Sequence, residues 1–227
     1  MRRLLAIIII IAVYVAYEAF FNHGSWNYKL TLVVQTPEGK VVASGVRKIY
    51  AGRDPIILQW LPSLTYGHAG VIGEAVVVDL GRNGVLFALL RSRQHSVDYG
   101  YNIIFNEFPH DGGTTSGGIR YYRSLKAKKE LAFDKLPLLV RFRDINAPKT
   151  VEEVDPNNLE ATFGKGVKLV SATLEMTDEE VTTGVDKQLV WLKEYYNKKL
   201  DGARLTSIEA ANRLANNLNS RSFKIGE

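Results

Sequence analysis

The chain has 227 residues, of which 46% are hydrophobic and 23% charged, and these fractions exclude wholesale disorder and a collagen-like fibre. Cysteine is absent, which excludes a disulfide scaffold, a cysteine nucleophile and thiolate-bound metal sites. The 29 basic and 24 acidic residues leave a net charge of +5, a mild excess that does not indicate nucleic acid as a partner.

The first predicted element is a hydrophobic segment at the N-terminus. Arg2 and Arg3 precede the stretch Leu4–Phe21, in which Glu18 is the single charged residue. As a helix this stretch is about 27 Å long at ~1.5 Å per residue, close to the roughly 30 Å of a bilayer core. Residues 1–21 are therefore predicted to be a transmembrane anchor, and the two arginines predict a cytoplasmic N-terminus.

A cleaved signal peptide is the main alternative for the same segment. It shares the basic start and the apolar core, but Ala16-Tyr17-Glu18 places an acid where a cleavage site needs a small residue. A twin-arginine export signal is disfavoured because the region before the apolar core is too short. A retained anchor is the favoured interpretation, and it places the rest of the chain on the far side of the membrane.

A short polar linker is predicted over 22–27, followed by one extracytoplasmic domain over 28–227. Period-two alternation of apolar and polar residues predicts a half-buried strand over 28–35. A Pro-Glu-Gly turn follows, and 41–50 is a plausible partner strand, so the domain is expected to begin with a hairpin.

The clearest local signal is a second hairpin. Strong β formers over 74–80 and 85–90 flank Gly81-Arg82-Asn83-Gly84, and Asn-Gly suits a tight turn. Few positions in this hairpin are polar, so it is expected to be central in the domain and covered on both faces. The segment 92–118 has several glycines and no sustained period, which predicts a long loop.

Helix signals increase toward the C-terminus. Strands cluster early and helices late, without regular βαβ alternation, so the predicted fold class is α+β: an N-terminal transmembrane helix, then one domain with a largely antiparallel sheet and C-terminal helices. The elements predicted after the long loop are helices over 119–131, 156–163, 185–200 and 206–218, and strands over 136–143 and 167–176.

No catalytic constellation, metal site or cofactor is predicted. The histidines lack metal-ligand spacing such as H-E-x-x-H, and neither a Walker loop nor a G-x-S-x-G motif occurs. A loop site within 92–118 is the alternative, and its candidate residues are His95, Asp98, His110 and Asp111. The simpler interpretation is that these side chains face solvent or form ordinary hydrogen bonds.

Five basic residues within ten positions form a candidate anion-binding patch. They are interleaved with Tyr121 and Tyr122, and such a patch is able to bind anionic lipid headgroups or a polyanionic envelope polymer. A solvated helix face is the favoured interpretation, because charge runs on helices are commonly surface. The residues of the patch are Arg120, Arg123, Lys126, Lys128 and Lys129.

Several segments of the C-terminal 90 or so residues resemble uncharacterised proteobacterial envelope proteins with an N-terminal membrane segment. These segments are VRFRDIN at 140–146, PKTVEEVDP at 148–156, Phe163-Gly164 and ATLEMTD at 172–178. The resemblance implies a bacterial envelope origin and a periplasmic location. Together with the predicted anchor, it gives the expectation of a single-pass inner-membrane protein with a periplasmic C-terminal domain. It implies no activity, cofactor or catalytic residue.

Three functional hypotheses follow. The preferred one is an anchored, non-catalytic binding or interaction module in the envelope, whose partner is an envelope protein or an anionic polymer. The alternative is an anchored periplasmic enzyme, hydrolase-like, with a site in the 92–118 loop. A small-molecule or lipid carrier is the third, and it requires a large apolar cavity.

Overall fold

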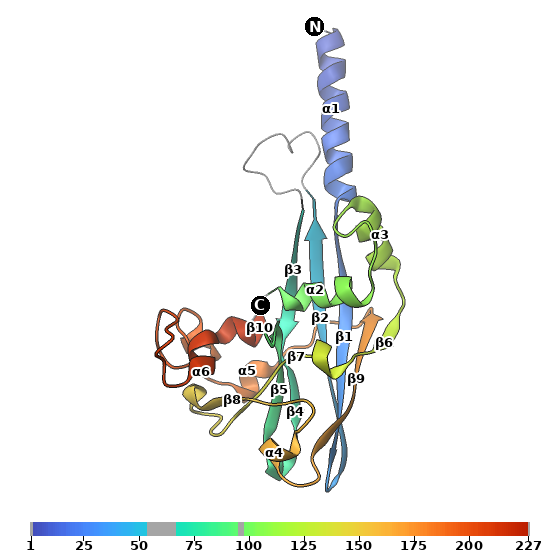
Figure 1. Ribbon diagram of the computed structural model, residues 1–227. Coiled ribbons are helices and arrows are strands. Elements are labelled where there is room, and N and C mark those ends of the chain that lie inside the picture. Colours follow the sequence, from blue (N-terminus) through green and yellow to red (C-terminus); the bar gives the residue numbers. More distant parts are fainter. Residues whose placement is uncertain (1, 54–66, 95–97, 227) are drawn as a thin grey trace.

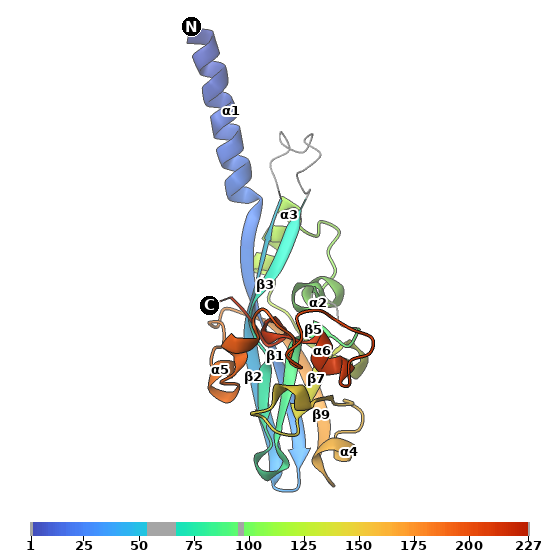
Figure 2. The ribbon, with the colours of Figure 1, turned by 90° about the vertical axis from the view of Figure 1, so that its left-hand side faces the viewer.

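The computed structural model describes residues 2–53, 67–94 and 98–226. The segment left unassigned from sequence, 56–64, lies outside these residues. Helix α1 (Arg2–Phe21) extends as one straight element away from the sheets, as Figure 1 and Figure 2 show. The predicted anchor is thus helical over the expected residues, but no helix in the described part of the chain is both long enough and apolar enough to cross a membrane.

The side chains described in α1 are almost all exposed. Over residues 5–17, Val15 alone is half-buried, and every other side chain faces solvent. Ile10 is 67% exposed and Val13 is 63% exposed, although both are apolar. The helix therefore presents apolar side chains on all sides, and among the described elements it makes its main contact with the strand that follows it.

The predicted first hairpin is confirmed and is longer than expected. Strand β1 (His23–Thr36) pairs antiparallel with β2 (Gly39–Gly52), and the pair Thr36–Gly39 closes a two-residue turn. Five of the six residues predicted as a linker, 23–27, belong to β1. The alternate side chains Trp26, Tyr28, Leu30, Leu32 and Val34 are buried, because period-two alternation turns one face of the strand to the core.

The described strands form two antiparallel sheets, which confirms the predicted α+β class with a largely antiparallel sheet. The larger sheet has the order β10-β3-β2-β1-β9-β6, and the smaller has the order β4-β5-β7-β8. Ala75 separates β3 from β4, so one nearly continuous segment passes from one sheet to the other. The strands not yet given are β3 (His68–Glu74), β4 (Val76–Asp79), β5 (Val85–Ser92), β6 (Lys128–Glu130), β7 (Pro137–Phe142), β8 (Val151–Glu153), β9 (Lys168–Thr177) and β10 (Lys224–Ile225).

The second hairpin lies between two hydrophobic clusters, as its apolar sequence predicts. Leu86 and Ala88 of β5 pack into the cluster that fills the space beside the larger sheet. Phe87 and Leu89 point to the opposite side and join the cluster under the C-terminal segments. The turn is a 3-10 helix, η2 (Gly81–Asn83), in place of a tight two-residue turn. The apolar run Val85–Leu90 of β5 is therefore covered on both faces.

A buried arginine joins the two sheets. The side chain of Arg47, on β2, is 0% exposed. Its Nε donates to the carbonyl oxygen of Glu74 at 3.1 Å, and its Nη2 donates to those of Ala88 and Leu89 at 2.9 and 3.1 Å. The last two carbonyls lie where the β5–β7 register shifts, so the guanidinium replaces hydrogen bonds that the irregular ladder cannot form.

The long loop predicted over 92–118 is wrong in part, because it contains helix α2 (Tyr99–Glu107) and the start of helix α3 (Ser116–Ser124). The basic helix predicted over 119–131 ends at Ser124, and the chain continues into β6. Each helix is nine residues long and buries few side chains, among them Ile104 and Tyr122. Helices this short do not repeat an apolar period often enough to reveal it in sequence.

The C-terminal third has less helix than predicted. The segment 185–200 contains two single turns, α5 (Val185–Gln188) and η5 (Leu192–Tyr195), and the last helix shortens to α6 (Arg213–Asn217). The expected apolar stripe is still mostly buried. The backbone N–H of Leu200 donates to the carbonyls of Ala215 and Leu218, both at 3.0 Å, and this long-range pairing takes the place of a helical bond. The other short turns are η3 (Phe133–Lys135), η4 (Pro148–Thr150), α4 (Glu160–Phe163) and η6 (Ser220–Ser222).

Candidate binding cleft

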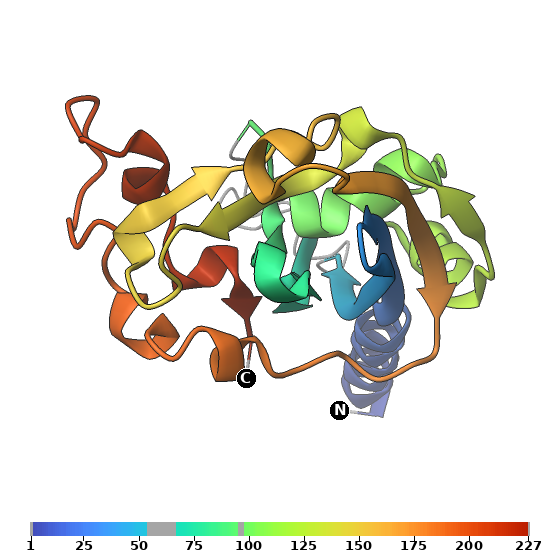
Figure 3. The same cartoon turned by 90° about the horizontal axis from the view of Figure 1, so that it is seen from below.

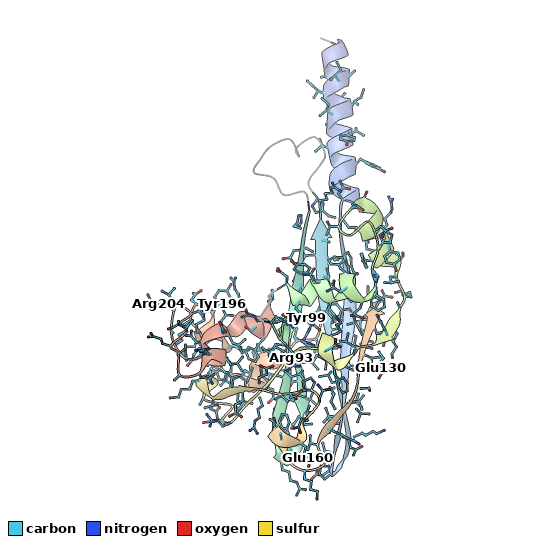
Figure 4. The ribbon with its side chains drawn as sticks, viewed as in Figure 1. Arg93, Tyr99, Glu130, Glu160, Tyr196 and Arg204 are labelled. Atoms are coloured by element: carbon cyan, nitrogen blue, oxygen red, sulfur yellow. The ribbon has the colours of Figure 1, made fainter. Side chains whose placement is uncertain are left out.

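A cleft of about 1050 Å³ opens between the edge of β3, the start of α2 and the C-terminal segments η5 and η6. The C-terminal segments lie on one side of the central hairpin, and α3 and β6 lie on the other, as Figure 3 shows from below. Tyr196 lies on the C-terminal side in Figure 4, and Tyr99, next to the cleft residue Asp98, lies on α2. The cleft is therefore a junction of segments that are far apart in sequence.

The cleft lining is basic and aromatic. Asp98 is the single carboxylate among the described lining side chains. Three tyrosines supply aromatic surface and hydroxyl groups, and five cations surround them. These residues are Tyr50, Tyr101, Tyr196, Arg91, Lys193, Lys199, Arg221 and Lys224.

Two of these cations have fixed partners inside the protein. Lys224 Nζ lies 3.0 Å from Glu74 Oε1 and 3.4 Å from Asp186 Oδ2. The hydrogen bond and charge of the buried Glu74 carboxylate raise the pKa of Lys224 above its ordinary value. Arg91 Nη1 donates to the carbonyl oxygen of Asn217 at 2.8 Å, and burial lowers the pKa of Arg91. These two side chains mainly hold the cleft walls together.

The other three cations are better placed for a ligand. Arg221 Nη2 donates to Tyr196 Oη at 2.7 Å, and its guanidinium carbon lies 4.8 Å from the tyrosine ring centroid. This contact orients the guanidinium while leaving most of its donors available. Neither Lys193 nor Lys199 forms an ion pair within the described residues. The cleft therefore carries positive charge that the protein itself does not neutralise.

The described residues of the predicted catalytic loop are not brought together. Asp98 immediately precedes α2 and lines the cleft. His110 lies beyond the other end of the same helix. This helix is roughly 13 Å long at ~1.5 Å per residue, so it separates the two side chains. His110 stacks on Tyr121 at 4.3 Å between centroids, and Asp111 is exposed. His95 lies outside the described residues.

No metal-binding cluster forms among the described side chains, where no group of three or more histidines and carboxylates converges. Two histidines do approach each other, His23 on β1 and His68 on β3, with ring centroids 5.6 Å apart. Gly52 lies between them in the pairing register, and its missing Cβ leaves room for both rings. Among the described residues, no third histidine or carboxylate joins this pair to form a metal-binding group.

The predicted basic patch is divided and largely neutralised. Residues 120 and 123 lie on α3, whereas 128 and 129 lie on β6, so the five side chains do not share one helix face. Lys126 pairs with Asp178, Lys128 with Glu175 and Lys129 with Glu107. Arg120 and Arg123, both exposed, have no ion pair in the described part of the chain and remain available on α3.

Sequence reasoning missed the cleft cations. Lys193, Lys199 and Arg221 come from segments predicted as helix or left unremarked, and no motif marks them. The available signal was the high proportion of basic residues in these segments. The neighbouring sequence does not show that their side chains face the edge of β3. Comparison of the chain with known protein families, curated proteins and solved structures finds no match.

Proposed function

We propose that this protein is a membrane-attached binding module whose cleft holds an anionic ligand. The observation that carries the proposal is the unneutralised positive charge of the cleft, with Lys193 and Lys199 lacking carboxylate partners among the described residues. Anionic ligands gain both attraction and faster association in such a cleft.

Attachment through α1 is the second part of the proposal. Its apolar side chains are exposed on all sides, and a protein partner normally covers one face of a helix whereas lipid surrounds it. A helix of 20 residues is about 30 Å long, comparable to a bilayer core. The basic pair before the apolar stretch supports the proposed orientation, with the N-terminus in the cytoplasm and the domain in the periplasm.

The attachment is tested by fusing alkaline phosphatase or a cytosol-active fluorescent protein to the C-terminus. Phosphatase activity without fluorescence, in a product retained in the membrane after carbonate washing, is the expected result. Fluorescence from the fusion places the domain in the cytosol and contradicts the proposed orientation. Release by carbonate, or a mature product that begins after residue 21, contradicts attachment by α1.

Anion binding is tested with fluorescein-labelled dextran sulfate and the full-length protein in a nonionic detergent. The double variant Lys193→Glu/Lys199→Glu is expected to weaken binding about tenfold or more, and wild-type binding is expected to weaken with salt. The matched control is Lys165→Glu/Lys168→Glu, which makes the same charge change on exposed residues outside the cleft lining. Equal loss in the two variants means that net charge, and not the cleft, determines binding.

A further inference from the structure

Strand β3 has an edge that is only partly paired. Its residues His68–Ile72 pair with β2, and on the other side β10 pairs with Glu74 and Gly73 alone. The cleft lies along the rest of that edge, because Ala69, Gly70 and Val71 line it. Within the described chain, no strand pairs with these three residues on the cleft side.

The pairing register shows which backbone groups face the cleft. Thr36 and Gly39 form the hydrogen-bonded closing pair of the first hairpin. Because hydrogen-bonded pairs alternate along an antiparallel ladder, the backbone N–H and C=O groups of odd-numbered β2 residues bond to β1, and those of even-numbered residues point toward β3. Tyr50 pairs with Gly70. The backbone N–H and C=O groups of even-numbered β3 residues therefore bond to β2, and those of odd-numbered residues point away from β2. Consistently, the N–H of Ala75 donates to Phe223 on the β10 side at 2.7 Å.

Ala69 and Val71 therefore direct their N–H and C=O groups into the cleft. Gly226, which follows β10, lies against Ile72. Strand residues rise about 3.3 Å each, so the remaining edge over His68–Val71 is roughly 13 Å long, enough for a strand of about four residues. The short strand β10 already uses the neighbouring part of the same edge in an antiparallel pairing. An extended segment entering the cleft would continue that pairing toward Ala69.

We propose that the cleft binds an extended acidic segment of a partner protein, which adds as a strand antiparallel to β3 in line with β10. This rests on the proposed function and specifies its ligand. Backbone bonds to Ala69 and Val71 hold the segment in register, and its acidic side chains meet Lys193 and Lys199. A second copy of this chain is a poor occupant, because its own edge carries the same positive charge.

The test uses a fluorescein-labelled heptapeptide of alternating glutamate and valine, measured by fluorescence anisotropy with the full-length protein in nonionic detergent. It is expected to bind, and a lysine–valine peptide of the same length is not. Methylating alternate backbone nitrogens of the acidic peptide, in the register that faces β3, removes the donors without changing its charge. This is expected to weaken binding about tenfold, whereas methylation in the other register has a smaller effect.

One protein variant and one hydrogen-exchange measurement test the same contacts from the side of the protein. Ala69→Pro removes an N–H that points into the cleft, a position where an edge strand tolerates proline. It is expected to weaken binding of the acidic peptide about tenfold and to weaken dextran sulfate binding less. If Ala69→Pro fails to fold, protection of the Ala69 and Val71 amides from hydrogen exchange on peptide binding replaces it.

The outcomes separate this inference from the proposed function. If the acidic peptide and its methylated forms bind equally, or if the two amides gain no protection, strand addition is refuted while the cleft remains an anion site. If the peptide fails to bind and dextran sulfate binds through Lys193 and Lys199, the partner is not an acidic polypeptide. If neither probe binds, both proposals fail, and the lysines serve to keep the open edge from pairing.

Discussion

Replacing Arg47 with methionine tests the contact that joins the two sheets. The substitution keeps a long flexible side chain of similar reach but removes the donors to the carbonyls of Glu74, Ala88 and Leu89. Each buried carbonyl left without a donor costs about 1 kcal/mol or more. Three such carbonyls give an expected loss of about 3 kcal/mol in the free energy of unfolding, in the range for removing one side of a buried charged network.

Arg47→Lys separates charge from geometry. A lysine ammonium keeps the charge, but it has no planar fork and cannot reach three carbonyls from two elements together. Its expected loss is about 2 kcal/mol, smaller than that of methionine. The matched control is Arg82→Met, whose side chain is 78% exposed and pairs with Glu38 on the surface. That change should stay within about 0.5 kcal/mol of the wild type.

The assay is urea denaturation of the full-length protein in nonionic detergent, followed by tryptophan fluorescence and circular dichroism. The proposed stabilisation by Arg47 is refuted if Arg47→Met is as stable as the wild type, or more stable. That result would mean that the cost of burying the guanidinium exceeds the value of its three hydrogen bonds, as happens at some buried ionic sites. Equal losses in Arg47→Met and Arg82→Met would show that the effect does not arise from burial.

Three further predictions concern α3, the cleft wall and α1. Gly118→Ala should cost about 2 kcal/mol, because its Cβ would lie 2.0 Å from a backbone oxygen, whereas Gly117→Ala, with its nearest neighbour at 3.7 Å, should be neutral or slightly stabilising. The raised pKa of Lys224 contributes stability below its unfolded value of 10.5, and this contribution should disappear as pH rises through the higher folded value. Placing arginine at Ile9 and Ile10 together should release the protein from membranes, since each costs roughly 2.5–3.5 kcal/mol in a bilayer centre.

Each of these predictions has a measurement that can contradict it. Urea midpoints compare the two glycine variants, and equal midpoints would show that the backbone around α3 relaxes at little cost. For the lysine, thermal midpoints of wild type and Lys224→Met are compared from pH 9 upward, and curves that stay parallel would contradict the pairing with Glu74. For α1, an unchanged carbonate-resistant fraction would contradict membrane attachment through that helix.

The candidate catalytic loop shows how tertiary structure changes the meaning of nearby residues. Asp98 and His110 are 12 positions apart and read as members of one loop. Helix α2 forms between them and holds them at opposite ends, so they have separate surroundings. At the start of this helix, Asp98 lines the same cleft as cations from the C-terminal segments.

The residues of the basic patch do not share one helix face, for a related reason. A charge run along one predicted helix implies a shared face, but the chain leaves the helix at Ser124 and enters the larger sheet through β6. There its lysines meet carboxylates such as Glu175 and Glu107, from β9 and α2. A charge count in sequence does not include partners that arrive from elsewhere in the fold.

The sequence by itself determined the class of the fold, both hairpins and which strand faces are buried. Period-two alternation in β1 and the uninterrupted apolar run of β5 are local signals, and the burial they require does not depend on which element covers them. The stripe over 185–200 is likewise mostly buried as predicted, although its backbone is not a continuous helix.

The tertiary structure alone decided the backbone of that stripe and the existence of the cleft. Leu200 bonds to carbonyls of Ala215 and Leu218, and the cleft combines β3 with residues more than 100 positions later. Side-chain polarity specifies that a residue should be buried or charged, but partners distant in sequence determine which hydrogen bonds it makes and which charges remain unpaired. A binding site that consists of unpaired charges and an unpaired strand edge therefore has no local sequence motif.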